Sequence, residues 1–169
     1  MGSDKSVVTG IFKTRSDAAA AVDRLTANGY RSDEISVLMS DRTKSKEFAL
    51  STGTQAAKGA GIGGAVGGTV GATLVGIAAA ATSLAVPGLG LVIAGPVAGA
   101  LAGAGAGAAT GGLVGMLVGA GIPEHRAKVY DAGLREGGIM VGVEPKGKHE
   151  IKNLEALLEQ TGAQNVRKE

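Results

Sequence analysis

Short apolar runs alternate with polar stretches at both ends of the chain. Residues 7–12 are rich in β-branched side chains and predict a strand. Four apolar residues then recur at the spacing of one helix face, between Ser16 as N-cap and a stop at Asn28-Gly29. They are Ala18, Ala21, Val22 and Leu25. Residues 35–39 predict a second strand, so the chain begins with a βαβ unit.

The carboxyl-terminal part shows a second set of such elements. Pro123 suits the first turn of a helix that runs through Tyr130 and Leu134 and stops at Gly137. Residues 139–143 form a short apolar run that predicts a buried third strand. The next helix carries Ile151, Leu154, Leu157 and Leu158 on one face and ends at Gly162. Residues 164–167 predict a fourth strand.

Neither half is long enough to bury a core of its own, so we expect the two halves to fold together. The predicted fold class is α+β, a split βαβ sandwich of ferredoxin-like type. Residues 1–41 form its first half and residues 123–169 its second half. Residues 42–58 are polar and are interpreted as a linker with some helix.

Residues 59–122 separate the halves and contain no charged residue. Glycine recurs at every fourth position in two rows, over residues 59–71 and 95–119, which is the pattern of a glycine zipper, in which small residues let helices pack closely. The glycines are Gly59, Gly63, Gly67, Gly71, Gly95, Gly99, Gly103, Gly107, Gly111, Gly115 and Gly119. Pro87-Gly88-Leu89-Gly90 divides the segment, which predicts a helical hairpin with helices at about 59–84 and 94–120. The seven glycines from Gly95 to Gly119 would cover much of the surface of the second helix. We therefore expect packing between copies of the chain and hence a homo-oligomer.

Each predicted helix is long enough for the roughly 30 Å hydrocarbon core of a bilayer. Basic residues flank the hairpin and place both of its ends on the cytoplasmic side. They are Arg42, Lys44, Lys46, Lys58, Arg126 and Lys128, which are also candidate contacts for lipid headgroups. Glycine and alanine drive insertion weakly, and no Trp or Tyr belt borders the segment. Packing inside a soluble assembly therefore stays open as the alternative.

No pattern in the sequence indicates an enzyme, a cofactor or a metal site. The formal net charge is only +2, and two Phe, two Tyr and no Trp argue against nucleic-acid binding. His125 and His149 are the only histidines, and the chain has no cysteine. A G-x-G-x-x-G pattern at residues 59–64 follows no predicted strand, so it lacks the context of a dinucleotide site. Whether the α+β domain binds a small molecule stays open.

Three stretches of the chain resemble a known family. Residues 35–41, 53–60 and 121–124, together with Tyr130 and the strand at 139–143, are similar to the bacterial general stress proteins, which include heat-induced and low-temperature-induced members. The resemblance covers roughly residues 6–144. It implies a stress-associated bacterial protein whose α+β domain is interrupted by a glycine-rich segment. It supplies no catalytic residue.

We therefore expect a non-enzymatic stress protein that self-associates through its hairpin in the bacterial inner membrane, with both termini in the cytoplasm. One alternative is a cytoplasmic scaffold, a filament or a shell, whose hairpins form the dry interior. Another is a sensor whose α+β domain binds a ligand and relays it to the hairpin.

Overall fold

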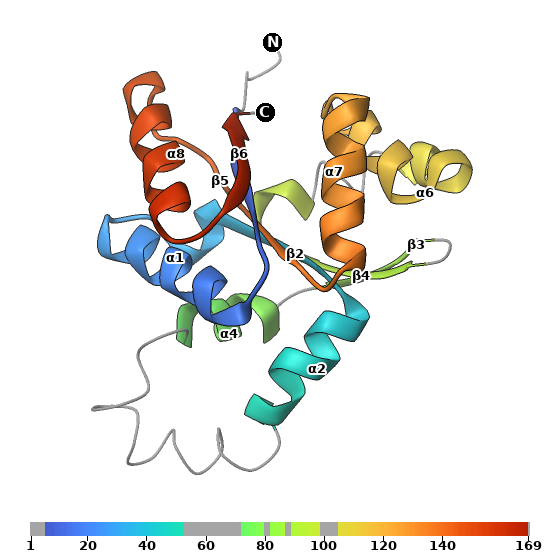
Figure 1. The fold of residues 1–169 in the computed structure, drawn as a ribbon, viewed down its shortest axis with the longest axis horizontal. Helices are drawn as coiled ribbons and strands as arrows, with labels where there is room; N and C mark the ends of the chain where they lie inside the picture. The colour runs from blue at the N-terminus through green and yellow to red at the C-terminus, as the bar shows by residue number, and fades with distance from the viewer. Residues whose placement is uncertain (1–5, 53–71, 80–81, 87–88, 99–104, 169) are drawn as a thin grey trace.

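A six-stranded antiparallel sheet runs through the centre of the protein, as a computed structural model shows (Figure 1). The structure describes residues 6–52, 72–79, 82–86, 89–98 and 105–168. The strands are β1 (Val8–Phe12), β2 (Ile35–Ser40), β3 (Thr82–Val86), β4 (Leu89–Ala94), β5 (Ile139–Val143) and β6 (Gln164–Lys168). Their order in the sheet is β3-β4-β2-β5-β1-β6. The predicted α+β class is confirmed.

The described α-helices are α1 (Arg15–Ala27), α2 (Asp41–Thr52), α4 (Ala72–Ala79), α6 (Gly105–Gly119), α7 (Glu124–Arg135) and α8 (Ile151–Gln160). Single 3-10 turns, η1 (Ser32–Glu34) and η2 (Lys148–Glu150), precede β2 and α8. The helix α1 begins one residue before the predicted N-cap, because the Thr14 hydroxyl accepts a hydrogen bond from the Asp17 N–H at 3.1 Å. The predicted N-cap, Ser16, therefore lies inside the helix.

Helices cover both faces of the sheet, so the core has two parts. On one face α1, α4 and α8 pack against side chains such as Phe12, Val37 and Val141. On the other face α6 and α7 pack against Leu38, Met140 and further strand residues. Figure 1 shows these two helical layers on opposite sides of the strands. Because both faces are covered, the central strands β1, β2 and β5 are buried along their whole length, including their polar residues Thr9, Ser36 and Ser40.

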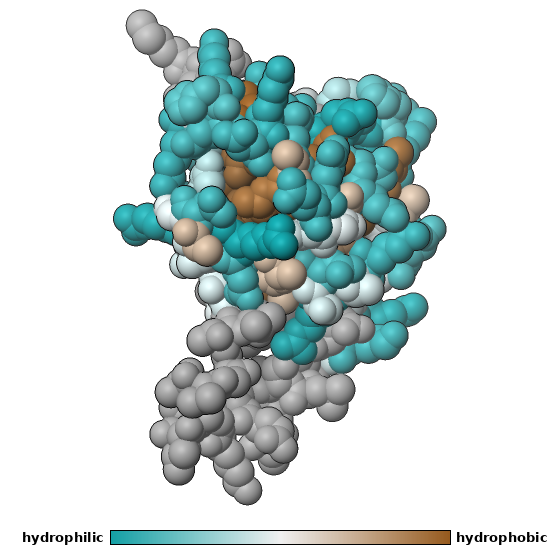
Figure 2. All heavy atoms as spheres, turned by 60° about the vertical axis from the view of Figure 1, so that its left-hand side comes forward, coloured by the Kyte–Doolittle hydropathy of each residue, from teal (hydrophilic) through white to brown (hydrophobic). Residues whose placement is uncertain are grey.

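The surface that carries α1 and α8 is mainly polar. Apolar residues appear there in small areas enclosed by polar side chains (Figure 2). The buried residues of α8 are Leu154 and Leu158, while Ile151 and Leu157 are partly buried against the same core. The predicted apolar face of this helix therefore packs onto the sheet.

The segment expected to be a linker with some helix, residues 42–58, is helical in α2 as far as Thr52, and residues 53–58 lie outside the described residues. The Ser40 hydroxyl accepts a hydrogen bond from the Thr43 N–H at 3.1 Å and so caps α2. Both side chains are buried, and their hydroxyls lie 2.8 Å apart. The cap could not be recognised from the polar composition, because serine and threonine are also typical of loops.

The predicted helical hairpin is wrong for residues 82–86 and 89–94. These residues form β3 and β4, and β4 extends the sheet by pairing with β2, with Val37 opposite Ala94 and Ser40 opposite Leu91. Apolar runs on both sides of Pro87-Gly88 suit a β-hairpin as well as a break between helices, and pairing with β2 decides between them. The helix expected at 94–120 is represented by α6, whose backbone is not helical at Gly112. The inserted segment is thus partly integrated into the same core.

Candidate functional site

The clearest trace of the glycine row is an exposed face on α6. After the break at Gly112, Gly119 is exposed and Gly115 is half-buried, whereas Leu113, Met116 and Leu117 are buried against the sheet and α7. Gly111 lies just before this break and is also exposed. A Cβ atom added at Gly111 would meet no atom within 4 Å. Val118, beside Gly119, is one of the exposed large apolar residues, with 42% of its surface accessible. This face therefore offers small and apolar residues to a partner.

Other members of the row lie elsewhere. Gly95 follows β4 with φ +88°, and a Cβ atom there would lie 2.7 Å from Ser36 Cα and closer still to the Ile35 carbonyl oxygen. Glycine is required at this position by the close approach of two backbones. Gly107 belongs to α6. The glycines outside the described residues are Gly59, Gly63, Gly67, Gly71, Gly99 and Gly103.

The basic residues predicted to flank the hairpin are divided between two helices. Arg42 and Lys46 are exposed and Lys44 is half-buried on α2. On α7, Lys128 forms an exposed ion pair with Glu124 at 2.7 Å, which lowers the pKa of that carboxyl through a hydrogen bond. The remaining two are Arg126, which contacts other residues of α7 and β6, and Lys58, which lies outside the described residues.

The described residues contain no metal site or membrane span of a recognisable kind. Within them, no group of three potential ligand side chains comes together, and His125 and His149 are both exposed. None of the helices in this part of the chain combines the length and the apolar character needed to cross a membrane. The G-x-G-x-x-G pattern at 59–64 lies outside the described residues.

An open groove of about 440 Å³ lies between α7 and the edge strand β6. Ile11 of β1 lies at its base and is only 4% exposed. Gly133 of α7 packs directly on this residue, because a Cβ atom at position 133 would lie 2.8 Å from Ile11 Cδ1. The groove also has polar walls, to which Glu136 and Asn165 contribute.

A buried hydroxyl pair lies beside this groove. The Tyr130 side chain is fully buried, and its hydroxyl lies 2.7 Å from the Thr9 hydroxyl. Arg126 donates a hydrogen bond to the Tyr130 hydroxyl and another, of 3.1 Å, to the backbone oxygen of Asn165. Its guanidinium also lies 5.2 Å from the centre of the Tyr130 ring. Arg126 thus connects α7 with β6, and Tyr130 connects it with β1.

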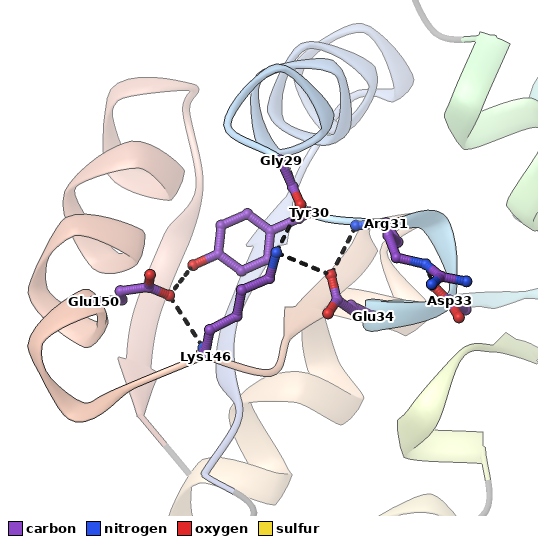
Figure 3. A network of polar contacts seen from close by, with 7 residues as sticks. All are labelled: Gly29, Tyr30, Arg31, Asp33, Glu34, Lys146 and Glu150. Atoms are coloured by element: carbon purple, nitrogen blue, oxygen red, sulfur yellow. Dashed lines mark hydrogen bonds and ion pairs between the residues drawn. The ribbon is translucent and has the colours of Figure 1, made fainter.

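A second polar network joins the two halves on the other side (Figure 3). The Tyr30 hydroxyl donates to Glu150 Oε2 at 2.6 Å, and the Lys146 backbone N–H donates to the same oxygen at 3.1 Å. Lys146 Nζ donates to the Gly29 carbonyl oxygen at 2.7 Å and lies 3.6 Å from a carboxylate oxygen of Glu34. Its ammonium lies 5.0 Å from the centre of the Tyr30 ring. The turn after α1 is thereby tied to the segment before α8.

This network changes the pKa of two groups. Burial, and then the hydrogen bond to Glu150, raises the pKa of Tyr30 well above its ordinary value. The same hydrogen bond, seen from the carboxylate, lowers the pKa of Glu150. Both shifts stabilise the arrangement of a neutral phenol that donates to a charged carboxylate.

Sequence reasoning missed the groove and both networks. The partners in them are 120 and 121 residues apart, and no local spacing connects them. One signal was present: Tyr30 and Tyr130 are the only tyrosines of the chain, and each lies at or near an apolar helix face. A buried tyrosine generally needs a partner for its hydroxyl.

Comparison with known proteins supports the resemblance noted above. No curated protein and no solved structure matches the chain. Residues 7–84 match the model of one family, the heat induced stress protein YflT domain. The matched residues include β1, α1, β2, α2, α4 and part of β3. Over residues 7–84 the chain is therefore similar to the heat induced stress protein YflT domain, which is consistent with the resemblance to the bacterial general stress proteins.

Proposed function

We propose that this chain is a non-enzymatic, stress-associated protein that self-associates through the glycine-rich face of α6. The observation that carries the proposal is the exposure of Val118 and Gly119 on the part of α6 that follows Gly112, whose other side is buried, together with the exposure of Gly111 just before this break. The match of residues 7–84 to a heat induced stress protein domain supports the association with stress. Small residues on an exposed helix face allow a second helix to approach closely, which favours packing between copies.

The supporting domain is proposed to be a ferredoxin-like sandwich. Its support is the strand order β2-β5-β1-β6 with antiparallel pairing throughout, and the two βαβ units β1-α1-β2 and β5-α8-β6. In this interpretation β3, β4, α6 and α7 are additions that extend the sheet and cover its second face.

The test of self-association is sedimentation velocity of the purified full chain and its Gly111→Leu variant. Position 111 has open space around it, so the monomer should accept leucine while the close approach of a partner is blocked. The matched control is Gly76→Leu, because Gly76 is also exposed and also has open space, but it lies on α4. We expect oligomers for the original chain and the control, and a monomer for Gly111→Leu. A monomeric original chain, or an unchanged Gly111→Leu oligomer, would overturn the proposal.

The place of assembly is a separate part of the proposal. The bacterial inner membrane, with both termini in the cytoplasm, is proposed on the basis of the uncharged segment and its basic flanks. Carbonate washing of membranes from cells that express the full chain tests it. Retention of the protein in washed membranes is the expected result, and release as large soluble particles would support the cytoplasmic assembly instead.

A further inference from the structure

The groove between α7 and β6 combines an apolar base with polar walls of both charges. Its volume, about 440 Å³, lies within the range of about 300–1,000 Å³ that is typical of sites for small ligands. Ile11 forms the base, and Val129 and Ala132 of α7 add apolar surface at the side. Val129 has 42% of its surface exposed, although its helix neighbours Ala127 and Tyr130 are buried. An apolar part of a ligand would cover this surface.

Four polar side chains line the same groove. Lys13 contributes an ammonium group and Glu136 a carboxylate, while Gln164 and Asn165 contribute two amides. In the described part of the chain, the Lys13 and Glu136 side chains form no ion pair with each other or with another residue. The groove therefore presents one cation, one anion and two amides that are available to a ligand.

The position of Asn165 is fixed by an irregularity of the sheet. The pairing of β6 with β1 shifts by one residue, from Thr9 opposite Arg167 to Ile11 opposite Gln164. Asn165 lies in this bulge with φ 55°, and Arg126 of α7 donates a hydrogen bond to its backbone oxygen. Bulges re-aim side chains and are over-represented next to functional sites. The bulge places an amide in the wall of the groove.

We propose that this groove binds short apolar peptides whose two ends are free. Lys13 pairs with the terminal carboxylate, Glu136 with the terminal ammonium, and the amides of Gln164 and Asn165 with the peptide groups. The apolar side chains of the peptide cover Ile11 and Val129. This inference is independent of the self-association proposed above, because α6 does not line the groove.

The experiment is a titration of the ¹⁵N-labelled full chain with the tripeptide alanyl-valyl-alanine, followed by amide chemical shifts. We expect saturable shifts at Ile11, Ala132 and Asn165, with weak affinity, because exposed ion pairs contribute little. The same tripeptide with an acetylated amino end and an amidated carboxyl end should bind several-fold more weakly. Equal binding of the blocked peptide would overturn the proposal, since it would show that the two terminal charges of the peptide do not contribute to binding.

Variants of the protein test the same point from the other side. Lys13→Met and Glu136→Gln should each weaken binding of the free tripeptide by about two- to fivefold. For the blocked tripeptide, neither variant should change the affinity. The matched controls are Lys152→Met and Glu159→Gln on the exposed side of α8, which should leave binding unchanged. Absence of saturable shifts in the original chain, or equal effects of variants and controls, would overturn the proposal.

Discussion

The Tyr30 hydroxyl donates a hydrogen bond of 2.6 Å to a carboxylate oxygen of Glu150, which is 120 residues further along the chain. Tyr30 follows α1 in the first half, and Glu150 lies directly before α8 in the second half. Only 7% of the Tyr30 surface is exposed, so its hydroxyl depends on this one acceptor. The contact holds together two parts of a domain that the inserted segment separates in sequence.

Replacing Tyr30 with Phe should make the stability of the protein less dependent on acidic pH. The bond lowers the pKa of Glu150 in the folded state below its ordinary value of 4.5. The resulting stabilisation is complete above pH 4.5 and is lost as the pH falls through the lower, folded-state pKa. Between pH 7 and pH 3, the free energy of unfolding should therefore fall less for Tyr30→Phe than for the original chain. Urea unfolding at several pH values measures this difference.

The raised pKa of Tyr30 predicts a second change of stability, in the alkaline range, which the same experiment measures. It is raised above 10.0 in the folded state, so its contribution is present below pH 10 and is lost as the pH rises towards the folded-state value. Tyr30→Phe should remove this loss. Glu159→Gln, which changes an exposed carboxyl on α8, is the control and should keep both the acidic and the alkaline loss of stability. Parallel curves for Tyr30→Phe and the original chain would contradict the assignment.

Two glycines of the same row should respond in opposite ways to alanine. Gly95→Ala forces a side chain onto a backbone with φ +88°, which costs about 1–3 kcal/mol, and the overlap with Ile35 and Ser36 adds to this. Gly111→Ala fills open space on a helix and should stabilise the protein by up to about 1 kcal/mol. Thermal unfolding of both variants measures the contrast. Equal changes at both positions would show that the row acts as one unit.

The contrast between Gly95 and Gly111 also shows that the glycine spacing alone does not predict the secondary structure of this segment. A glycine at every fourth residue predicts helices that pack closely, yet Gly95 follows a strand and Gly111 lies in a helix. The spacing is a local signal, whereas the conformation of residues 82–86 and 89–94 depends on the pairing of β3 with β4 and of β4 with β2. Such pairing is non-local and leaves no period in the sequence.

By contrast, β1, α1, β2, β5, α8 and β6 lie within a few residues of their predicted positions. Their signals are local ones, such as the apolar face of α8 and the stop at Gly162, whose φ is +95°. The groove could not be predicted in the same way. Lys13 and Glu136 line the same groove only because α7 packs on β1, and Gly133 permits that packing.

The buried hydroxyl of Tyr130 should be important for stability. Tyr130→Phe removes the partner of the Thr9 hydroxyl and of Arg126, so buried polar groups lose a hydrogen bond. We expect a loss of about 1–3 kcal/mol in the free energy of unfolding. Thr9→Val, measured alone and together with Tyr130→Phe, completes a double-mutant cycle. A coupling energy near zero would mean that the two hydroxyls do not stabilise each other.

Asn165 should tolerate glycine but not valine, because its φ of 55° lies in the left-handed region. A β-branched residue is strained in this conformation, at a cost of about 1–2 kcal/mol, whereas glycine adopts it freely. Gln164→Val is the matched control, since Gln164 is also exposed on β6 but lies outside the left-handed region. Urea unfolding should therefore rank Asn165→Gly and Gln164→Val close to the original chain and Asn165→Val clearly below them. Equal stability of Asn165→Val and Gln164→Val would contradict this expectation. It would show that the bulge does not need a residue that accepts positive φ.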